Sequence, residues 1–372
     1  MNGKKWIKIV LVLSIIVGGF IGSSNYFIDP YGMNNSIVID RINKYKKSNT
    51  GYTFRFKTNI VSNNKFDTLM LGTSRIGVMN PEIVDKYING KTFNFDAPGS
   101  VTEQQHKLFL YSLKYNKIKT LVYGIDFMSF NKNRIIKNDF KEFYELKDKI
   151  ENKEPISNYD LYFNIKTFKD SFQVLVFNLI DKKIIESHYL IKNGMRDYTD
   201  HIHNLKRGKL KLDDNIKSSI KSYFKLNTGI YKKYKFSYKY LEYFKKTIEY
   251  CNSNNIKVYV YIPPMYSEHF DAIASANYFD EFELFKKEIV KITDYIDFTG
   301  HNTIAENKNN YWDSSHLRKE VTEIVMAKVF NDRMVNIPKD FGVFIMKDNI
   351  DEHLIKLRTQ IKNYDLNKTL SE

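Results

Sequence analysis

Short apolar segments that alternate with amphipathic stretches constrain the fold of this chain more than any other feature. One such segment, TLMLG, occupies residues 68–72, and another, IKTLVYGIDF, occupies residues 118–127. Between them, residues 102–116 carry apolar side chains at roughly helical spacing. The same order of helix and strand returns in residues 241–262. Strands that alternate with helices in this way predict an α/β fold built on a parallel sheet.

The N-terminus has the features of a membrane anchor. An apolar run from Trp6 to Gly22 follows Lys4 and Lys5. As a helix this run would rise about 26 Å, close to the roughly 30 Å of a membrane's hydrocarbon core. The lysines favour a cytoplasmic N-terminus and an extracytoplasmic main domain in a single-pass protein of the cell membrane. A cleaved signal peptide is the alternative, since IGSS at residues 21–24 offers small residues, although no A-x-A pattern is present.

The remaining regions differ in composition, and we divide the chain accordingly. Residues 1–24 are the predicted anchor, and residues 25–64 form a juxtamembrane segment with weak periodicity. Residues 65–335 carry the strand and helix pattern, and residues 336–372 form a C-terminal extension. Within the pattern, residues 131–236 are rich in Lys, Tyr, Phe and Asn and lose the alternation. We expect this stretch to be a mostly helical insertion.

Charge and cysteine content narrow the classes of partner. The formal net charge is +15, which favours anionic partners such as lipid headgroups or acidic surface polymers. The lysines are scattered along the chain rather than gathered with aromatic residues, so we expect no nucleic-acid site. With the single cysteine Cys251, the chain cannot form an internal disulfide.

The segment after the first predicted strand has the pattern of a catalytic turn. In LGTSR, Ser74 follows Gly72, and this glycine allows a sharp turn that lifts the hydroxyl above the sheet. Ligands of parallel sheets bind at the carboxyl ends of the strands, where Gly99 and Gly124 also lie. Backbone amides ahead of a helix would be free to face an oxyanion. Ser74 is therefore a candidate nucleophile, with an ordinary turn serine as the alternative.

A nucleophilic serine needs a base and a group that orients the base. Among the eight histidines, His316 stands out because Asp313 precedes it by three residues in NNYWDSSHLRKEV. On one local turn the carboxylate can reach the imidazole, although a helix-capping pair is the alternative. His201 and His203 form an H-x-H pattern without an evident third ligand, so we expect a solvated loop there and no metal or cofactor.

The order of these motifs resembles that of the SGNH, or GDSL-type, hydrolase superfamily. Ser74 follows the first strand, Gly99 follows the second, and Asp313-Ser314-Ser315-His316 precedes the last helix. More narrowly, the chain resembles membrane-anchored, extracytoplasmic SGNH-like proteins of cell-wall acylation. These include the D-alanyl transfer protein of lipoteichoic acid synthesis and polysaccharide O-acetyltransferases. The likeness covers roughly residues 66–330.

The resemblance implies a fold and a division of roles. The fold is a flavodoxin-like, three-layer α/β/α sandwich with a parallel sheet. Ser74 would be the nucleophile, His316 the base and Asp313 the residue that orients the base. The backbone amides of Ser74 and Gly99 would donate to the oxyanion.

The sequence departs from this family at two positions. Thr73 replaces the aspartate of the Gly-Asp-Ser triplet, and Asp126 stands where an asparagine usually donates to the oxyanion. An ionised carboxylate cannot donate a hydrogen bond and would repel an oxyanion. Asn94 or Asn131 would be substitutes, although nothing in the spacing establishes it. Loss of one donor can cost about 3 kcal/mol, which fits a slow, dedicated transferase.

Three functions follow as expectations. The first is a serine O-acyltransferase that moves an acyl group onto an anionic or glycan polymer of the cell wall or surface. The family implies a multi-spanning membrane O-acyltransferase as partner, because cytoplasmic acyl donors do not cross the bilayer unaided. The second function is a carbohydrate esterase that uses the same residues. The third is a non-catalytic, membrane-tethered binding or assembly protein, for which Asp126 would be the physical reason.

Overall fold

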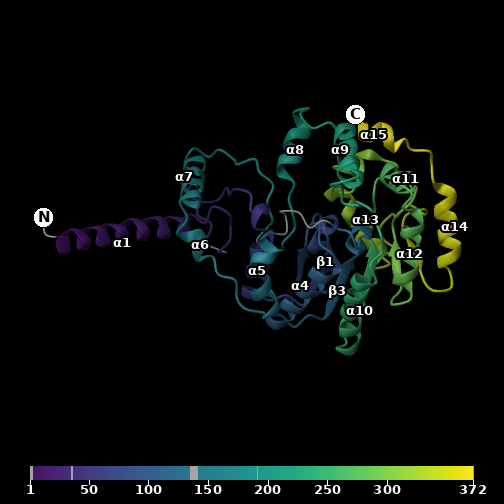
Figure 1. Cartoon of the computed structure of the whole chain (residues 1–372), viewed down its shortest axis with the longest axis horizontal. Coiled ribbons are helices and arrows are strands. Elements are labelled where there is room, and N and C mark those ends of the chain that lie inside the picture. Colours follow the sequence, from purple (N-terminus) through teal and green to yellow (C-terminus); the bar gives the residue numbers. More distant parts are fainter. Residues whose placement is uncertain (1–2, 35–36, 135–140, 191, 372) are drawn as a thin grey trace.

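A six-stranded sheet forms the centre of the part that the computed structural model describes, residues 3–34, 37–134, 141–190 and 192–371 (Figure 1). Its strands are β1 (Thr68–Gly72), β2 (Thr92–Asp96), β3 (Thr120–Gly124), β4 (Lys257–Ile262), β5 (Tyr295–Asp297) and β6 (Val343–Ile345). They lie in the order β2-β1-β3-β4-β5-β6. Every neighbouring pair is parallel except β5 and β6, which are antiparallel. The predicted α/β class is therefore confirmed. The sheet was expected to be parallel, and it is parallel except at β6, which lies in the predicted C-terminal extension.

Helices fill the intervals between the strands, as the sequence pattern predicted. They are α1 (Gly3–Ile28), α2 (Thr53–Asn63), α3 (Pro81–Ile88), α4 (Thr102–Tyr115), α5 (Lys141–Glu151), α6 (Tyr159–Tyr162), α7 (Ile165–Leu179), α8 (Thr199–Lys206), α9 (Leu212–Phe224), α10 (Tyr238–Ser253), α11 (Ser267–Ser275), α12 (Phe279–Val290), α13 (Thr322–Val329), α14 (Ile350–Gln360) and α15 (Leu366–Ser371). Helices α5 to α9 lie within the predicted insertion, residues 131–236.

Both faces of the sheet are covered, because alternate strand residues enter two different hydrophobic clusters. In β1, Leu69 and Leu71 belong to one cluster, whereas Met70 belongs to the other. Helices α2, α4, α10 and α12 contribute side chains to the first cluster. Helices α3 and α13 contribute side chains to the second. Burial on both faces explains why these strands are continuous apolar runs in the sequence.

Helix α2 belongs to the core, although the sequence placed it in the juxtamembrane segment. Phe56 and Ile60 on α2 are fully buried in the first cluster. Lys57, which is also buried, pairs with Asp96 at the end of β2. The packed domain thus begins before the predicted boundary at residue 65.

The C-terminal residues also contribute to the sheet and its cover. In β6, Val343 lies opposite Asp297 of β5. Leu354 and Leu357 of α14 are buried in the first cluster. Much of the predicted C-terminal extension, residues 336–372, is therefore packed into the domain.

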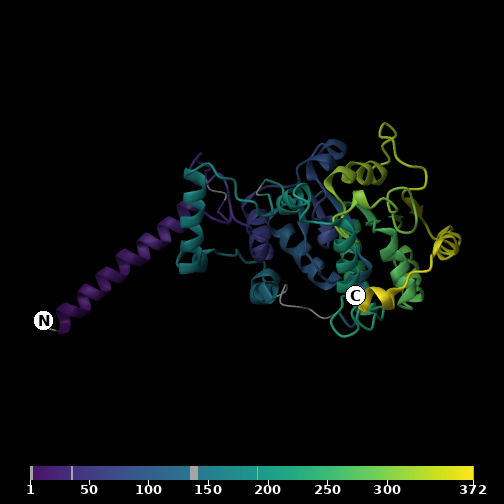
Figure 2. The same ribbon diagram turned by 90° about the horizontal axis from the view of Figure 1, so that it is seen from above.

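Helix α1 stands apart from the domain. Figure 2 shows it projecting from the body of the protein, with α7 beside its C-terminal end. It runs for 26 residues, past the predicted end of the anchor at residue 24. Among the described residues, α1 is the one helix that is long and apolar enough to cross a membrane. Membrane anchors and signal sequences share this property.

Candidate active site

A close approach of two strands shapes the turn that carries Ser74. Strand β1 ends at Gly72, whose φ is +152°, and a Cβ there would lie 2.3 Å from the carbonyl oxygen of Gly124. Glycine therefore allows β1 and β3 to end side by side. A short 3-10 turn, Ser74–Ile76, follows directly. It leaves Ser74 partly exposed at the carboxyl edge of the sheet.

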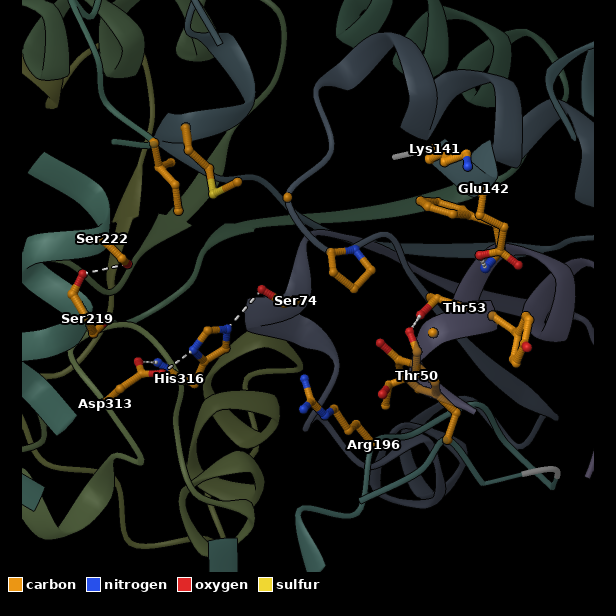
Figure 3. Close-up of a pocket in the computed structure, with 18 of the residues that line it drawn as sticks. Thr50, Thr53, Ser74, Lys141, Glu142, Arg196, Ser219, Ser222, Asp313 and His316 are labelled. Carbon is orange, nitrogen blue, oxygen red and sulfur yellow. Dashed lines mark hydrogen bonds and ion pairs between the residues drawn. The ribbon is translucent and has the colours of Figure 1, made fainter. Parts of the chain in front are cut away.

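Ser74, His316 and Asp313 form a continuous chain of hydrogen bonds (Figure 3). The Ser74 hydroxyl lies 2.8 Å from His316 Nε2. His316 Nδ1 lies 2.8 Å from Asp313 Oδ2. The predicted convergence of Ser74 and His316 is therefore confirmed across 242 positions of sequence. Asp313 and His316 do not cap the next α-helix, since α13 begins only at Thr322 and has no side-chain cap.

The loop that carries Asp313 and His316 is closed by its own residues. Tyr311 and Leu317 form an isolated antiparallel bridge. Asp313 Oδ1 accepts the amide of Ser315 at 2.7 Å and the amide of His316 at 3.0 Å. This local turn is why a D-x-x-H spacing can bring the carboxylate to the imidazole.

Asp313 is held as a carboxylate. Burial alone would raise its pKa, but the His316 ring and the two amide hydrogen bonds outweigh burial and hold the pKa of Asp313 well below its usual range. An ionised Asp313 keeps the Nδ1–H of His316 directed toward itself. Nε2 is then the nitrogen that can accept the proton of the Ser74 hydroxyl.

The amides of Ser74 and Gly99 are available to a negatively charged oxygen. Both residues line one cavity together with His316. Gly99 has a φ of +69° in the turn that follows β2. Within the described part of the chain, neither amide donates a hydrogen bond to another protein group. The residues that carry these two unused amides therefore line the cavity that contains the Ser74 hydroxyl.

Asp126, which replaces the expected oxyanion asparagine, is fully buried in an ion pair. Its Oδ2 lies 3.1 Å from Arg75 Nε and accepts the Thr73 hydroxyl at 3.0 Å. Its Oδ1 accepts the Met128 amide at 3.2 Å. Burial alone would lower the pKa of Arg75. The charge of the Asp126 carboxylate outweighs this effect, so the pKa of Arg75 is raised. Asp126 thus ties the Ser74 turn to the residues after β3, and its charge is balanced by Arg75.

Asn94 and Asn131 use their amide groups within the protein. Asn94 Nδ2 donates to the carbonyl oxygens of Ile76 at 2.7 Å and Met79 at 3.0 Å. Asn131 Nδ2 donates to the carbonyl oxygen of Ile230 at 3.2 Å. Both asparagines are buried and neither lines the cavity beside Ser74. The idea that one of them supplies a third oxyanion donor is therefore corrected: both hold the backbone around the site.

The cavity extends from the three residues to the opposite wall formed by α2 and α5 (Figure 3). Its volume is about 910 Å³. Ser74 and His316 lie at one end, and Thr50, Thr53 and Glu142 lie at the other. The charged residues of the lining carry both signs: Arg55, Arg134, Lys141, Arg196, Glu142, Glu145, Asp160 and Asp313. The predicted insertion thus supplies walls of the cavity through α5 and α9.

Two important residues near the site were not found from the sequence. The sequence does not indicate a role for Arg75 beyond its position after Ser74, because its burial depends on residues that are far from it in the sequence. His269 lies 2.8 Å from Ser314 through Nδ1 and Oγ. Burial and the nearby Arg75 charge hold the pKa of His269 well below its ordinary value, so this second histidine stays neutral.

His201 and His203, which were expected in a solvated loop, instead lie in helix α8. His201 lines the cavity and lies 2.8 Å from Asp200. No group of three or more His, Cys, Asp or Glu side chains in the described residues is arranged to hold a metal ion.

The arrangement can perform acyl transfer through serine. It has a partly exposed hydroxyl, a base in contact with that hydroxyl, an ionised carboxylate behind the base and two unused amides nearby. Such an assembly recurs on unrelated folds, so it indicates a reaction type rather than a family. No protein-family model matches the chain, and no curated protein matches it either.

Proposed function

We propose that the protein is a membrane-anchored, extracytoplasmic serine acyl-transfer enzyme. The single observation that carries the proposal is the unbroken chain from Ser74 through His316 to Asp313, with 2.8 Å at both contacts. This chain lies at one end of a cavity large enough for an extended substrate. The α1 helix supports the membrane location.

The sheet topology supports membership of the SGNH-like group. The strand order β2-β1-β3-β4-β5 is that of flavodoxin-like folds, and helices lie on both faces. Ligands of such folds bind at the carboxyl ends of the strands, where Ser74 is found. The flavodoxin-like, three-layer sandwich is therefore the fold we propose for the packed domain that follows α1.

The reaction would proceed through an acyl-enzyme. Ser74 Oγ attacks the acyl carbonyl while His316 Nε2 takes its proton. The amides of Ser74 and Gly99 would then donate to the oxyanion of the tetrahedral intermediate. His316 returns the proton to the leaving group, and the acyl ester remains on Ser74. An acceptor hydroxyl, deprotonated by His316, attacks this ester. The bond between the acyl carbon and Ser74 Oγ breaks, His316 returns the proton to Ser74, and the acyl group leaves on the acceptor.

The acceptor we propose is a hydroxyl of an anionic or glycan polymer of the cell envelope. A net charge of +15 favours such polymers. Arg196, which lines the cavity, offers a cationic contact for acidic groups. The acyl group would come from a multi-spanning membrane O-acyltransferase, because activated acyl donors are made inside the cell.

Hydrolysis is the second candidate, since the same residues would pass the acyl group to water. The non-catalytic alternative loses its main argument, because Asp126 is balanced by Arg75 and does not line the cavity. A carbohydrate esterase and a transferase would share every step up to the acyl-enzyme. They differ only in the group that attacks it.

Acyl-enzyme formation tests the proposal directly. The purified protein is treated with a p-nitrophenyl ester, and the peptide that contains Ser74 is analysed by mass spectrometry. Wild type should gain one acyl group at Ser74, and Ser74→Ala should gain none. Ser222→Ala is the matched control, because Ser222 lines the same cavity and bonds to the carbonyl of Ser219 instead of a histidine. Acylation of Ser74→Ala at the wild-type rate would show that Ser74 is not the nucleophile.

A chase experiment separates the two candidate reactions. The acylated protein is mixed with water alone or with a soluble polyol phosphate as model acceptor. Transfer to the acceptor at a rate above hydrolysis supports the acyltransferase. Release of free acid at a rate that the acceptor does not change supports the esterase.

A further inference from the structure

Helix α7 buries polar side chains and exposes apolar ones, unlike a helix that packs on a soluble domain. Its buried residues include Thr167, Ser171 and Asn178, which are polar and at most 3% exposed. Of its apolar residues, Val174 is buried, whereas Phe172, at 64% exposure, and Leu179, at 57%, face outward. A surface helix normally buries its apolar face and exposes its polar one. The outward apolar face of α7 therefore requires a partner.

The polar face of α7 has a clear structural purpose. Asn178 accepts the amide of Tyr45 at 2.8 Å and donates to the carbonyl of the same residue at 3.0 Å. Ser171 donates to the side chain of Asn25 at 2.9 Å. These bonds fasten α7 to the C-terminal end of α1 and to the segment that follows it. They leave the apolar face turned away from the protein.

The outward face extends over a contiguous unit, residues 159–180, which we call the α6–α7 unit. Its apolar side chains with more than a third of their surface exposed include Phe163, Ile165, Phe172, Val176, Leu179 and Ile180. Exposed apolar patches of this kind mark sites of contact with protein or membrane.

The α6–α7 unit is joined to the C-terminal end of α1. The rings of Phe20 and Phe168 lie 5.8 Å apart, and those of Tyr26 and Tyr162 lie 5.5 Å apart. Asn25 donates to the Tyr162 carbonyl at 2.7 Å. Figures 1 and 2 both show α7 running across the end of α1 rather than along it. The apolar surface of α1 thus continues onto the unit.

The length of α1 sets the level of this junction in a membrane. A bilayer core of roughly 30 Å is crossed by about 20 helical residues. A span that begins at Trp6, a residue type that favours the membrane interface, therefore ends near Asn25. Asn25 is the residue that the α6–α7 unit holds. The unit accordingly lies at the boundary between hydrocarbon and headgroups.

Charge and shape at this boundary also fit lipid. Lys166 and Lys169 near the start of α7, and Lys182 and Lys183 after its end, are exposed. Such lysines are attracted to anionic headgroups beside an apolar face that enters the acyl region. A small hollow of about 300 Å³ between α1 and α6 is lined mostly by glycine and aromatic residues, including Phe163. Its walls suit hydrocarbon better than water.

From these observations we propose that the α6–α7 unit is a second membrane-contacting element, which lies in the outer interface with its apolar face among the lipid acyl chains. This inference rests on the membrane anchoring of α1 proposed above. It adds that the insertion contacts the bilayer directly. Two contacts with the membrane, rather than one, would then fix the domain at the membrane surface.

Fluorescence quenching by brominated lipids tests the position of the unit in the full chain. Phe172→Cys and Leu179→Cys are labelled with a polarity-sensitive fluorophore and reconstituted in phosphatidylcholine–phosphatidylglycerol vesicles. The bromines are placed either close to the headgroup or near the tail end of the acyl chains. Ile355→Cys is the matched control, because Ile355 is an apolar residue on α14 with 65% exposure, at the opposite end of the molecule (Figure 1). Cys251 is buried, so the wild-type chain serves as the blank.

We expect quenching at residues 172 and 179 to exceed that at residue 355 at least threefold, with the shallow bromines more effective than the deep ones. Leu13→Cys, in the middle of α1, reports on the anchor and should be quenched by the deep bromines. Quenching at residue 13 without quenching at 172 and 179 would overturn the inference and keep the anchor. No quenching at any of the three would overturn both. Stronger quenching at residue 172 by the deep bromines than by the shallow ones would show deep insertion and overturn the inference. Energy transfer between labels on two chains, without quenching, would show contact with a second copy and also overturn it.

Discussion

Asp313 influences the chemistry through its hydrogen bond to His316. The pKa of Asp313 is lower in the folded protein than in the unfolded chain, where it is about 3.9. Its carboxylate therefore adds its full contribution to stability above this unfolded pKa. This contribution is lost as pH falls through the lower folded pKa. We therefore expect Asp313 to remain ionised from pH 5 to pH 9, so that its own protonation causes no loss of acylation in this range.

Asp313→Asn should separate the orientation of His316 from its reactivity. An amide at this position favours the wrong tautomer of the ring while Ser74 and His316 stay in place, so acylation should slow by roughly 10³–10⁴-fold. Ser74→Ala and His316→Ala should abolish the acyl-enzyme, with little further loss in the double variant. Single-turnover acylation by a p-nitrophenyl ester measures all of these. Asp313→Asn that acylates as fast as wild type would contradict the role of the carboxylate.

The ion pair between Arg75 and Asp126 should matter for stability more than for chemistry. Arg75→Met would leave the Asp126 carboxylate buried without its counter-charge, which typically costs about 3–5 kcal/mol. Adding Asp126→Asn removes that charge and should recover a large part of the loss. Lys192→Met is the control, because its pair with Glu82 is exposed and should be worth less than about 1 kcal/mol. Denaturant unfolding in detergent is measured for four variants: Arg75→Met, Asp126→Asn, the double variant of these two, and Lys192→Met. Strictly additive losses in the double variant would argue against the pair.

At the scale of elements, one carboxyl group joins the insertion to the core. Glu142 on α5 accepts the amides of Phe54 and Arg55, both at 3.0 Å, at the start of α2. Burial raises the pKa of Glu142 from 4.5 to about 7. The folded state therefore binds this proton more tightly than the unfolded state. Its contribution to stability is complete below pH 4.5 and is lost as pH rises through about 7.

Glu142→Gln should make stability less dependent on pH. The glutamine keeps an acceptor oxygen for the α2 amides but does not titrate. Wild type should lose up to about 3 kcal/mol between pH 4.5 and pH 7 through this group, and the variant should not. Glu145→Gln on the same helix, at an exposed position, is the control. Unfolding free energies at pH 5 and pH 8 decide the matter: equal pH dependence in both variants would show that Glu142 is not the group responsible.

The elements also show where sequence reasoning succeeds. The strand at residues 68–72 and the D-x-x-H turn at 313–316 could be predicted because both are fixed by neighbours in the sequence. Helix α2 was missed, since its burial depends on a sheet that the preceding residues do not reveal. Arg75 was missed for the same reason: its partner Asp126 lies on another strand end. The cavity could not be predicted at all, because segments from many parts of the sequence, between Thr50 and His316, contribute to its walls.

At the scale of the whole molecule, the chain consists of an exposed apolar helix, α1, and a packed domain. Helix α1 would extend about 39 Å along its 26 residues, more than the hydrocarbon core requires. The packed core begins only with the segment that precedes α2. The cavity opens between that segment and the sheet, so the proposed site belongs to the domain that follows α1.

Orientation in the membrane should follow the lysines. Lys4, Lys5 and Lys8 precede or enter the apolar helix, and positive residues are retained on the cytoplasmic side. Lys5→Cys and Ile355→Cys are therefore treated on intact cells with a membrane-impermeant maleimide; wild type is the blank, because Cys251 is buried. Residue 355 should be labelled at once, and residue 5 only after the cells are permeabilised. The reverse pattern would contradict the orientation. A shortened chain released into the medium would show instead that α1 is a cleaved signal sequence, and the proposed enzyme would then act without an anchor.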